Sequence, residues 1–472
     1  MNRSTRTETV MTAIRKQIET RALTPGERLP SIRAFATTMR VSPSTVVDAY
    51  DRLAAEGLIQ ARRGSGFFVR DTPQPLRIAR GGPQFDRAID PFWISRQSLD
   101  ADPQLPKPGC GWLPPDWMPT ASLRRALRTL ARAEDGTLTD YGSAQGPAAL
   151  RRLVARDLLE QGLEVPPDRI LLTGSGSQSM DLICRLLLRP GDTVLVDDPC
   201  YFNFQALLRA HQVQLVAVPY TPQGPDLERF AERLETAAPR LYLTNSALHN
   251  PTGATLSAQT AHRVLMLAAH HDLTIIEDDI LAAFEPEPAP RLAALDGLER
   301  VIRIGSFSKT LSASMRCGYI AARPEWIAAL IDLQVATSFG GPSPMATDLT
   351  FSVLSDGGYR KHMAALRTRL ARARKDAVTR LGALGITPWI LPRGGFYLWC
   401  CLPEGLDGAD VARAALKEEL VLAPGNAFSV SRSLPGFMRF NVSQMGGLEV
   451  DAVLARALNS AREMARQRSG DG

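Results

Sequence analysis

One lysine of this 472-residue chain stands where its amine could do covalent chemistry. Lys309 ends the segment GSFSK at residues 305–309, directly after the apolar run 301–304, which we predict to be a β-strand. An amine that attacks a carbonyl group needs a lowered pKa and polar neighbours, and a loop at a strand end can supply both. Arg316, seven residues further on, can pair with a phosphate group through two hydrogen bonds. The segment therefore predicts a nucleophilic lysine beside an anion-binding arginine.

Three more polar segments follow predicted strands. The Gly/Ser-rich stretch 173–178 lies between a strand and a helix, a position where backbone N–H groups bind phosphate. The acidic run 277–279 ends another strand. Such acids most often only solvate a loop, but beside a pyridine ring one carboxylate can keep the ring nitrogen protonated. Asn250, in the turn HNPTG at residues 249–253, can direct its amide to a phenolic oxygen on such a ring. Each segment is weak evidence alone.

From residue 111 onward, apolar runs alternate with helical stretches. This alternation predicts βα units, and hence an α/β body with a mostly parallel sheet covered by helices. The chain after about residue 340 is rich in predicted helix, has later strands near 395–400 and 438–442, and is expected to form a smaller α+β domain. The strands predicted for the main sheet are 170–172, 194–196, 215–218, 241–243, 273–276 and 301–304.

In this order, the NPTG turn, the acidic strand end and S-x-S-K with its following arginine resemble the fold-type I aminotransferases, which use pyridoxal 5′-phosphate (PLP). The resemblance covers about residues 111–464. It implies that Lys309 holds the cofactor covalently, that Asp278 pairs with the ring nitrogen and that Asn250 bonds the phenolic oxygen. The other implied roles are ring stacking by Tyr201, phosphate binding by Ser177, Gln178, Ser306 and Arg316, contact with the neighbouring subunit's phosphate by Tyr141, and binding of a substrate carboxylate by Arg439. Taken alone, either tyrosine would more often be a core residue.

The first 70 residues carry a different pattern. They hold 12 Lys+Arg against 6 Asp+Glu, so the whole formal surplus of +6 lies here, which suggests a nucleic-acid-binding module joined to a neutral body. Apolar spacing, caps and breaks predict three helices, the third from Ser42 to about Glu56, and then two short strands around a basic glycine turn at 62–66. This is the order of a winged helix-turn-helix, whose third helix enters the major groove of DNA.

The stretch 29–69 resembles the GntR-type winged helix over its whole length. DNA-binding residues expected from the resemblance and from their placement are Arg33, Ser44, Thr45, Arg62, Arg63 and Gly64. Pro43 stands where the family often has arginine, a departure that affects one guanine-type contact. The alternative is a winged helix used only for protein contacts.

Between these two parts, residues 71–111 are rich in proline and glycine and carry five charges of each sign. We predict a linker here, partly ordered where Phe92, Trp93 and Ile94 can dock on the body. The predicted domains are therefore a winged helix at 1–70, a linker at 71–111 and an aminotransferase-like, PLP-binding effector domain at 112–472.

A GntR-type winged helix, a linker and an aminotransferase body in one chain resemble the MocR-type transcription regulators. In that family the body senses a ligand and forms a head-to-tail homodimer, with each winged helix packed on the partner's body. This chain departs from the family at Ile280, where tyrosine is usual, at Ala313, often proline, and at Cys200, often glycine. Because isoleucine cannot donate to the phenolic oxygen, we infer a site that binds PLP but is poorly tuned for turnover.

Three functions remain open on the sequence. The favoured one is a PLP-dependent transcription regulator whose body senses an amino compound, or PLP itself, with little or no transaminase turnover. The second is a working aminotransferase that also binds DNA. The third is a regulator that has lost PLP and uses the body only to form a dimer.

Composition limits where the chain can act. No run of about 18 apolar residues could span a membrane, and the polar start does not resemble a signal peptide. The six cysteines are scattered without a C-x-x-C pair, so we expect reduced, buried thiols and no metal site. The expected location is the cytoplasm, and the expected partners are double-stranded DNA, a small-molecule effector and a second copy of the chain.

Overall fold

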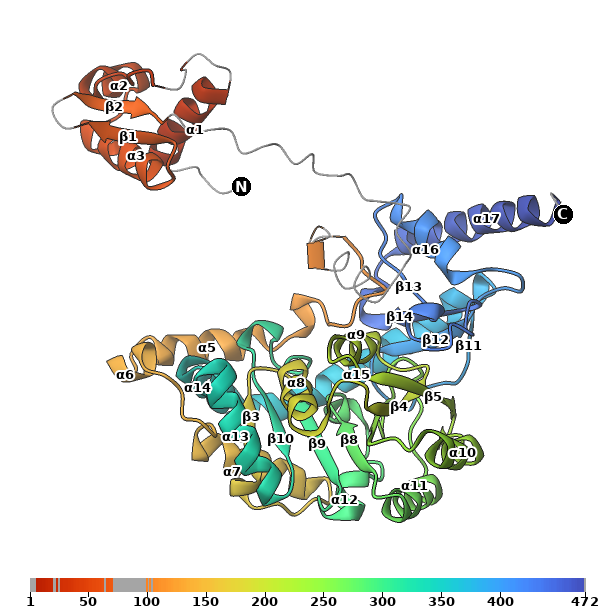
Figure 1. Cartoon of the computed structure of the whole chain (residues 1–472). Coiled ribbons are helices and arrows are strands. Elements are labelled where there is room, and N and C mark those ends of the chain that lie inside the picture. The colour runs from red at the N-terminus through yellow and green to blue at the C-terminus, as the bar shows by residue number, and fades with distance from the viewer. Residues whose placement is uncertain are drawn as a thin grey trace. The chain divides into compact units, whose positions relative to one another are not determined.

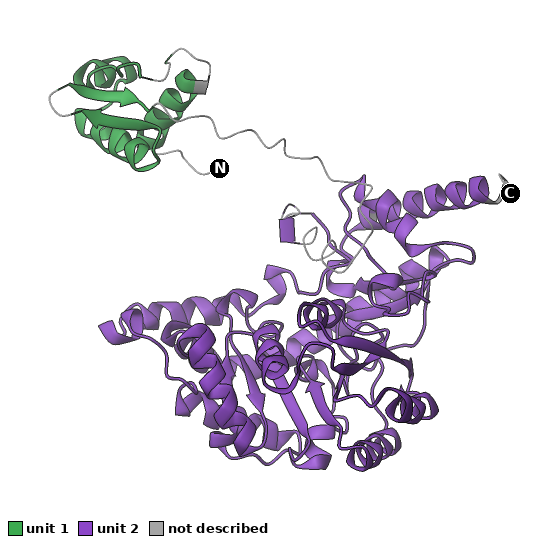
Figure 2. Cartoon of the chain, viewed as in Figure 1, with its two compact units in different colours: residues 1–86 green, residues 87–472 purple. Residues whose placement is uncertain are grey.

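The computed structural model describes residues 6–19, 23, 26–62, 65–70, 99–100, 102 and 105–470, and it divides the chain into two compact units, 1–86 and 87–472 (Figure 2). The predicted docking residues Phe92, Trp93 and Ile94 lie outside the described residues. No helix in the described ranges has both the length and the apolar character that crossing a membrane requires.

The N-terminal unit has the predicted order of elements: α1 (Arg6–Glu19), α2 (Ile32–Met39), α3 (Pro43–Ala55), β1 (Ile59–Arg62) and β2 (Gly66–Val69) (Figure 1). Ser31 and Ser42 begin α2 and α3 by accepting a hydrogen bond from a backbone N–H in the first turn, as predicted. The inward face of α3 is fully buried, and β1 pairs with β2 in an antiparallel hairpin. The winged helix-turn-helix prediction is confirmed.

The second unit is built on an eight-stranded sheet with the order β3-β10-β9-β8-β7-β4-β5-β6 (Figure 1). The bounds of these strands are β3 (Ile170–Thr173), β4 (Thr193–Asp198), β5 (Gln214–Thr221), β6 (Gly224–Pro225), β7 (Leu241–Thr244), β8 (Thr274–Asp278), β9 (Val301–Ser306) and β10 (Gly318–Ala321). All six predicted strands are present, and β5, β4, β7, β8 and β9 run parallel.

One strand of this sheet was not predicted. Strand β10 lies between β3 and β9 and is antiparallel to both. Its four residues, GYIA, form a run too short to separate from the preceding loop by periodicity, so the sheet is mixed rather than wholly parallel.

Helices cover both faces of the sheet because the strands are apolar on both sides. On one face pack α7 (Ala148–Glu160), α10 (Leu227–Ala237), α11 (Ala258–His270) and α12 (Leu292–Asp296). On the other pack α8 (Gly176–Leu187), α9 (Phe202–Ala210) and α13 (Pro324–Ser338). The carboxyl ends of β7, β8 and β9 therefore lie at one edge of the sheet, between the two layers of helices. Open α/β sheets bind their ligands at this edge.

The predicted smaller α+β domain is also present. A four-stranded antiparallel sheet has the order β11-β12-β14-β13. The bounds of its strands are β11 (Thr387–Pro388), β12 (Tyr397–Cys401), β13 (Ala423–Pro424) and β14 (Phe437–Asn441). Its core is shared with the remaining helices. These are α15 (Gly357–Ala383), α16 (Gly408–Leu416) and α17 (Leu448–Gly470), while α5 (Thr120–Leu130), α6 (Asp135–Thr139) and α14 (Pro344–Ser355) lie together at the other end of the unit.

The last residues of the predicted linker belong to this unit. Gly109 N–H donates to Val421 O at 2.8 Å, and Pro108 O accepts from Asn441 N–H at 2.7 Å. Lys107 and Cys110 are buried. Proline and glycine here give the segment a fixed path through the body rather than the extended spacer that composition suggested.

Candidate functional site

Lys309 follows β9 and is half-buried at the ends of the central strands. Burial lowers the pKa of its amine to about 8, and its electrostatic neighbours are Cys110, Arg439, Asp278 and Arg316. Asp278 ends β8, and burial raises the pKa of its carboxyl to about 7. A buried amine and a buried carboxyl thus share one site, and both titrate close to neutral pH.

The acidic run 277–279 divides between the two faces of the sheet, as alternation along a strand requires. Glu277 accepts from the backbone N–H groups of Leu292 and Ala293 at the start of α12, at 2.8 and 3.0 Å. Asp279 pairs with Arg291 and Arg303, each at 2.6 Å. The middle residue, Asp278, interacts electrostatically with Lys309, and it is the acid that the resemblance assigns to the ring nitrogen.

Asn250 lies against Arg439 from the other domain. Arg439 Nη1 donates to Asn250 Oδ1 and Nη2 donates to Gly109 O, both at 2.8 Å, while Nε has no hydrogen-bond partner among the described residues. The guanidinium is fully buried and lies 4.2 Å from the ring centroid of Tyr397 and 4.7 Å from that of Phe428. Arg439 is therefore a buried cation with an unused N–H, as a carboxylate-binding residue would be.

Tyr201 stands at the start of α9. Burial raises the pKa of its hydroxyl to about 12, and both Arg439 and Asp278 act on it electrostatically. Its hydroxyl accepts from Asn203 Nδ2 at 2.8 Å, and its ring packs edge-on against Phe204. Tyr201 therefore belongs to the same cluster as Asp278 and Arg439.

The predicted phosphate ligands lie at the start of α8 and after β9. Ser177 is exposed in the first turn of α8, and Gln178 bridges Gly174 N–H and the hydroxyl of Ser338, at 2.5 and 2.9 Å. Ser306 ends β9 and accepts from Ser308 N–H at 3.2 Å. Arg316 is exposed at the edge of a hollow of about 500 Å³ that Gly174 also lines. The N-terminus of α8 and an exposed arginine are thus available to an anion.

These residues fit PLP by their donor and acceptor chemistry. The buried carboxyl of Asp278 has no cationic hydrogen-bond partner among the described residues and would gain one in a protonated pyridine nitrogen. Lys309 offers a buried amine of lowered pKa, and Arg439 keeps one N–H unused. When bound, the cofactor would supply an aldehyde for the amine and an electron-withdrawing ring.

Two residues of this site, Gly111 and Tyr397, were not predicted from the sequence. A Cβ on Gly111 would lie 3.1 Å from the hydroxyl of Tyr397 and 3.9 Å from Lys309 Nζ, so Gly111 lies close to both side chains. Gly111 comes from the segment predicted to be linker, and Tyr397 from a strand of the smaller domain. No local pattern marks either one, because tertiary packing alone brings them to Lys309.

Ile280, the main departure from the MocR pattern, packs on α8. A Cβ on Gly176 would come within 2.6 Å of Ile280 Cδ1. Ile280 N–H donates to Asp278 Oδ1 at 3.1 Å. The side chain therefore fills apolar space beside the phosphate-binding helix and offers no donor. Of the other departures, Cys200 is buried and Ala313 is exposed.

Tyr141 is separate from this cluster within one chain. Its side chain is 77% exposed and packs edge-on against Phe339, itself 67% exposed, with ring centroids 4.9 Å apart. Two large exposed aromatic residues in contact are unusual on a surface that faces only water.

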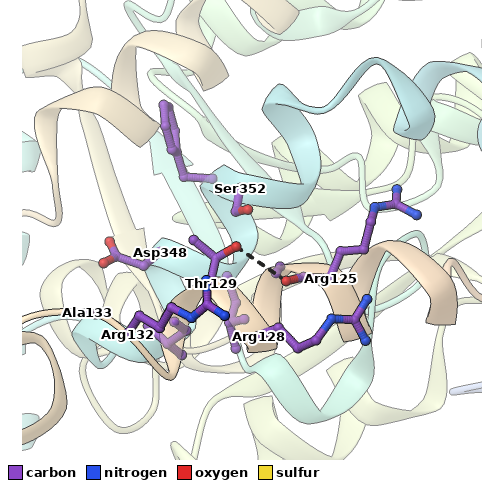
Figure 3. Close-up of a pocket in the computed structure, with 11 residues that line it drawn as sticks. Arg125, Arg128, Thr129, Arg132, Ala133, Asp348 and Ser352 are labelled. Carbon is purple, nitrogen blue, oxygen red and sulfur yellow. Dashed lines mark hydrogen bonds between the residues drawn. The ribbon is translucent and has the colours of Figure 1, made fainter.

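A larger hollow, of about 810 Å³, lies between α5 and α14 and not at Lys309. Figure 3 shows its arginines, Arg125 and Arg128 on α5 and Arg132 just after this helix, with Asp348 and Ser352 on α14. Arg125 pairs with Asp356 at 2.7 Å. None of the site residues predicted from the sequence lines this hollow.

In the winged helix, the described DNA-binding candidates are on the surface. Arg33 is exposed on α2, and the hydroxyls of Ser44 and Thr45, in the first turn of α3, both lie 2.8 Å from Ser42 Oγ. Arg62 ends β1 with its guanidinium 4.5 Å from the centroid of the Phe68 ring. Arg63 and Gly64 lie outside the described residues.

Comparison with known proteins assigns both units. Residues 6–69 match the family of bacterial regulatory proteins, gntR family, and residues 114–456 match aminotransferase class I and II. The uncharacterized HTH-type transcriptional regulator YdcR of Escherichia coli K12 is 30% identical over 93% of this chain and 96% of its own length. The regulator YisV of Bacillus subtilis 168 is 27% identical over 94% of this chain and 92% of its own.

Solved structures agree on the fold of the body. LysN, an α-aminoadipate aminotransferase from Thermus thermophilus solved with N-(5′-phosphopyridoxyl)-L-leucine, is 26% identical, with a TM-score of 0.71 over 79% of this chain and 95% of its own. Kynurenine aminotransferase from Pyrococcus horikoshii is 23% identical, with a TM-score of 0.70 over 81% of this chain and 96% of its own. With a GntR-type winged helix joined to a fold-type I aminotransferase body, and with HTH-type regulators as full-length relatives, the chain belongs to the MocR-type transcriptional regulators.

Proposed function

We propose that this chain is a PLP-dependent transcription regulator that acts in the cytoplasm and whose body senses a small molecule at the Lys309 site. The observation that carries the proposal is the interaction of Lys309 with the buried Asp278, in a site that also holds Asn250 and Arg439, in a chain that begins with a winged helix. Lys309 holds the cofactor, Asp278 its ring nitrogen and Asn250 its phenolic oxygen. Ser177, Gln178, Ser306 and Arg316 hold the phosphate, and Tyr201 packs on the ring.

The effector is an amino compound with a carboxylate, or PLP itself. Arg439 supports the first, because its unused Nε–H is buried and a carboxylate is the partner that such a group favours. Arg33, Ser44, Thr45, Arg62, Arg63 and Gly64 contact DNA. The domains are the winged helix at 1–70, the linker at 71–111, whose last residues pack in the body, and the effector domain at 112–472.

Two copies act together as a head-to-tail homodimer. The exposed contact between Tyr141 and Phe339 supports this arrangement, because a second copy would cover both rings and bring Tyr141 to the partner's phosphate site. Sedimentation of the wild type and of Tyr141→Ala tests it: a monomeric wild type would contradict the dimer.

The test of the function combines spectroscopy with DNA binding. The purified chain should show an absorbance band for lysine-bound PLP that borohydride reduces, and a promoter fragment that it binds should be released or rearranged when the effector is added. Lys309→Ala should lose the band. A protein that binds DNA but never takes up PLP would support the alternative in which the body only forms a dimer.

A working aminotransferase is the second candidate, and Ile280 argues against it. Without a tyrosine at this position, Asn250 is the main donor to the phenolic oxygen, so the pKa of the lysine-bound cofactor should be higher than in an enzyme with the tyrosine. Ile280→Tyr should lower it. Transamination of common amino acids by the wild type at about 10 s⁻¹, a median enzyme rate, would favour the enzyme.

A further inference from the structure

A fully buried cluster of polar side chains lies beside Asn250. At its centre, Asp197 of β4 accepts from the Tyr242 hydroxyl at Oδ1, at 2.5 Å, and from the Thr244 hydroxyl at Oδ2, at 2.7 Å. Asp197 and Tyr242 are almost completely buried. No arginine or lysine pairs with Asp197 among the described residues, so neutral donors and one imidazole surround a buried carboxylate.

His249, the residue before Asn250, connects this carboxylate to the NPTG turn. Its Nε2 faces Asp197 Oδ2 at 3.2 Å without forming a hydrogen bond, and its Nδ1 lies 2.8 Å from the Thr252 hydroxyl. The imidazole is fully buried. Nε2 therefore faces Asp197 on β4, and Nδ1 faces Thr252 within the NPTG turn.

One hydrogen-bond arrangement accounts for the contacts of both ring nitrogens. Thr252 Oγ1 accepts from Ala254 N–H at 3.2 Å, which leaves its own proton to donate to His249 Nδ1. Nδ1 is then the acceptor nitrogen, and Nε2 carries the proton on the side of the ring that faces Asp197. In this arrangement the imidazole is neutral, Nδ1 accepts from Thr252 and the Nε2–H group faces Asp197.

The same cluster extends to Asp278. The Tyr220 ring stacks on His249, with centroids 3.9 Å apart and planes inclined by 15°. The Tyr220 hydroxyl donates to Asn245 O at 3.3 Å, and Asn245 Nδ2 donates to the backbone oxygen of Asp278 at 2.8 Å. One chain of contacts thus joins Asp197 and His249 to the residues expected at the ring nitrogen and at the phenolic oxygen of the cofactor.

From these contacts we propose that His249 and Asp197 are positioning residues for the cofactor: they fix the NPTG turn so that Asn250 directs its amide to the phenolic oxygen. Neither residue touches the cofactor. Their effect is large in this chain because Ile280 supplies no second donor, so the direction of one amide decides the hydrogen bonding at that oxygen. The inference rests on the proposed PLP site.

The test measures the pKa of the lysine-bound cofactor by absorbance across pH. A donor to the phenolic oxygen lowers this pKa, so His249→Ala and Asp197→Asn should each raise it by about one pH unit, the size expected for one lost hydrogen bond. His249→Gln, which keeps a side-chain N–H, should restore part of the shift. His211→Ala is the matched control, because His211, directly after α9, also pairs with a carboxylate, that of Asp181 in α8, at 2.8 Å.

A double change separates positioning from general loss of structure. If His249 acts through Asn250, His249→Ala should add no further shift to Asn250→Ala, whereas independent effects would sum. Unchanged cofactor pKa values in both His249→Ala and Asp197→Asn, with thermal stability lowered as in His211→Ala, would overturn the proposal. If these variants do not fold, Tyr242→Phe removes one donor to Asp197 without a cavity and should still raise the pKa. A wild type that never shows the lysine-bound band would instead contradict the proposed function.

Discussion

Ile280 and Gly176 touch across the start of the predicted phosphate-binding helix. The methyl end of Ile280 occupies the space where a Cβ of residue 176 would lie, at 2.6 Å, and Ile304 Cγ2 is 3.7 Å from the same point. The residue that departs from the family pattern is therefore also the one that requires glycine at the first position of α8.

Gly176→Ala should consequently destabilise the chain and weaken PLP binding. An extra methyl group in a filled site costs about 1–3 kcal/mol, and here it would push α8 away from the phosphate. Ile280→Val removes the colliding Cδ1, so the double variant should regain much of the loss. Urea unfolding and PLP titration measure both effects. Gly382→Ala, in α15 with nothing within 4 Å, is the control and should not destabilise. Equal losses in the single and double variants would show that the two residues do not conflict.

The capture of PLP by the cofactor-free protein should follow the pKa of Lys309. Only the neutral amine attacks an aldehyde, and burial lowers this pKa to about 8 from an ordinary value near 10.5. The amine is protonated below pH 8, so the rate should rise through pH 7 to 8 and level off above about pH 9. Stopped-flow absorbance measures it, with Lys309→Ala as the blank. A rate that still climbs steeply at pH 10 would mean that the amine is not the buried group described here.

An effector with a carboxylate should depend on Arg439. Removing one partner of a buried, hydrogen-bonded charge pair typically costs about 2–5 kcal/mol, so Arg439→Ala should weaken such a ligand by at least about tenfold. PLP itself should stay bound, because Lys309 and Asp278 are untouched. Calorimetry with the cofactor-loaded protein measures the ligand, and the absorbance band monitors the cofactor. If Arg439→Ala still regulates transcription normally under the condition to which the wild type responds, the result would point to PLP as the effector.

The sequence predicted most strands of the main sheet and the polar residues at their ends. The same physical reasons explain which elements it did not predict. The strands β7, β8 and β9 are buried on both faces and form apolar runs, and the polar residues at their ends were visible directly after them. Strand β10 was missed because four residues after a tight turn carry no periodic pattern.

The missed site residues show a second limit. Gly111 lies in a stretch whose prolines and glycines indicate a linker, but the order of this stretch comes from backbone hydrogen bonds to β14 and to residue 421, far away in the sequence. Tyr397 lies in a strand of the smaller domain, and only the packing of the two domains brings its hydroxyl near Lys309. Local composition cannot report contacts of this kind.

DNA binding should come from the winged helix and weaken steeply with salt. Each phosphate contact contributes about −0.9 to the slope of log affinity against log salt concentration. Arg62 ends β1 and lies over the Phe68 ring, which holds its guanidinium on the wing, so Arg62→Ala should make the slope shallower by about one unit if it touches phosphate. Arg15→Ala is the control: it removes the same charge from α1, but Arg15 pairs with Glu56 at 2.6 Å and should not change the slope. Gel-shift titrations at several salt concentrations measure both slopes, and a slope unchanged in Arg62→Ala would remove this arginine from the phosphate contacts.

Sequence preference should depend on α3 and on two winged helices acting together. Ser44 is exposed in the first turn of α3, where a recognition helix meets base edges, so Ser44→Ala should relax the preference without changing the salt slope. One winged helix reads too few base pairs to select a site, so a duplex with two half-sites should bind the full chain far more tightly than a duplex with one. Titrations of the two duplexes at one salt concentration decide the point, and equal affinity for both would exclude a pair of winged helices acting together.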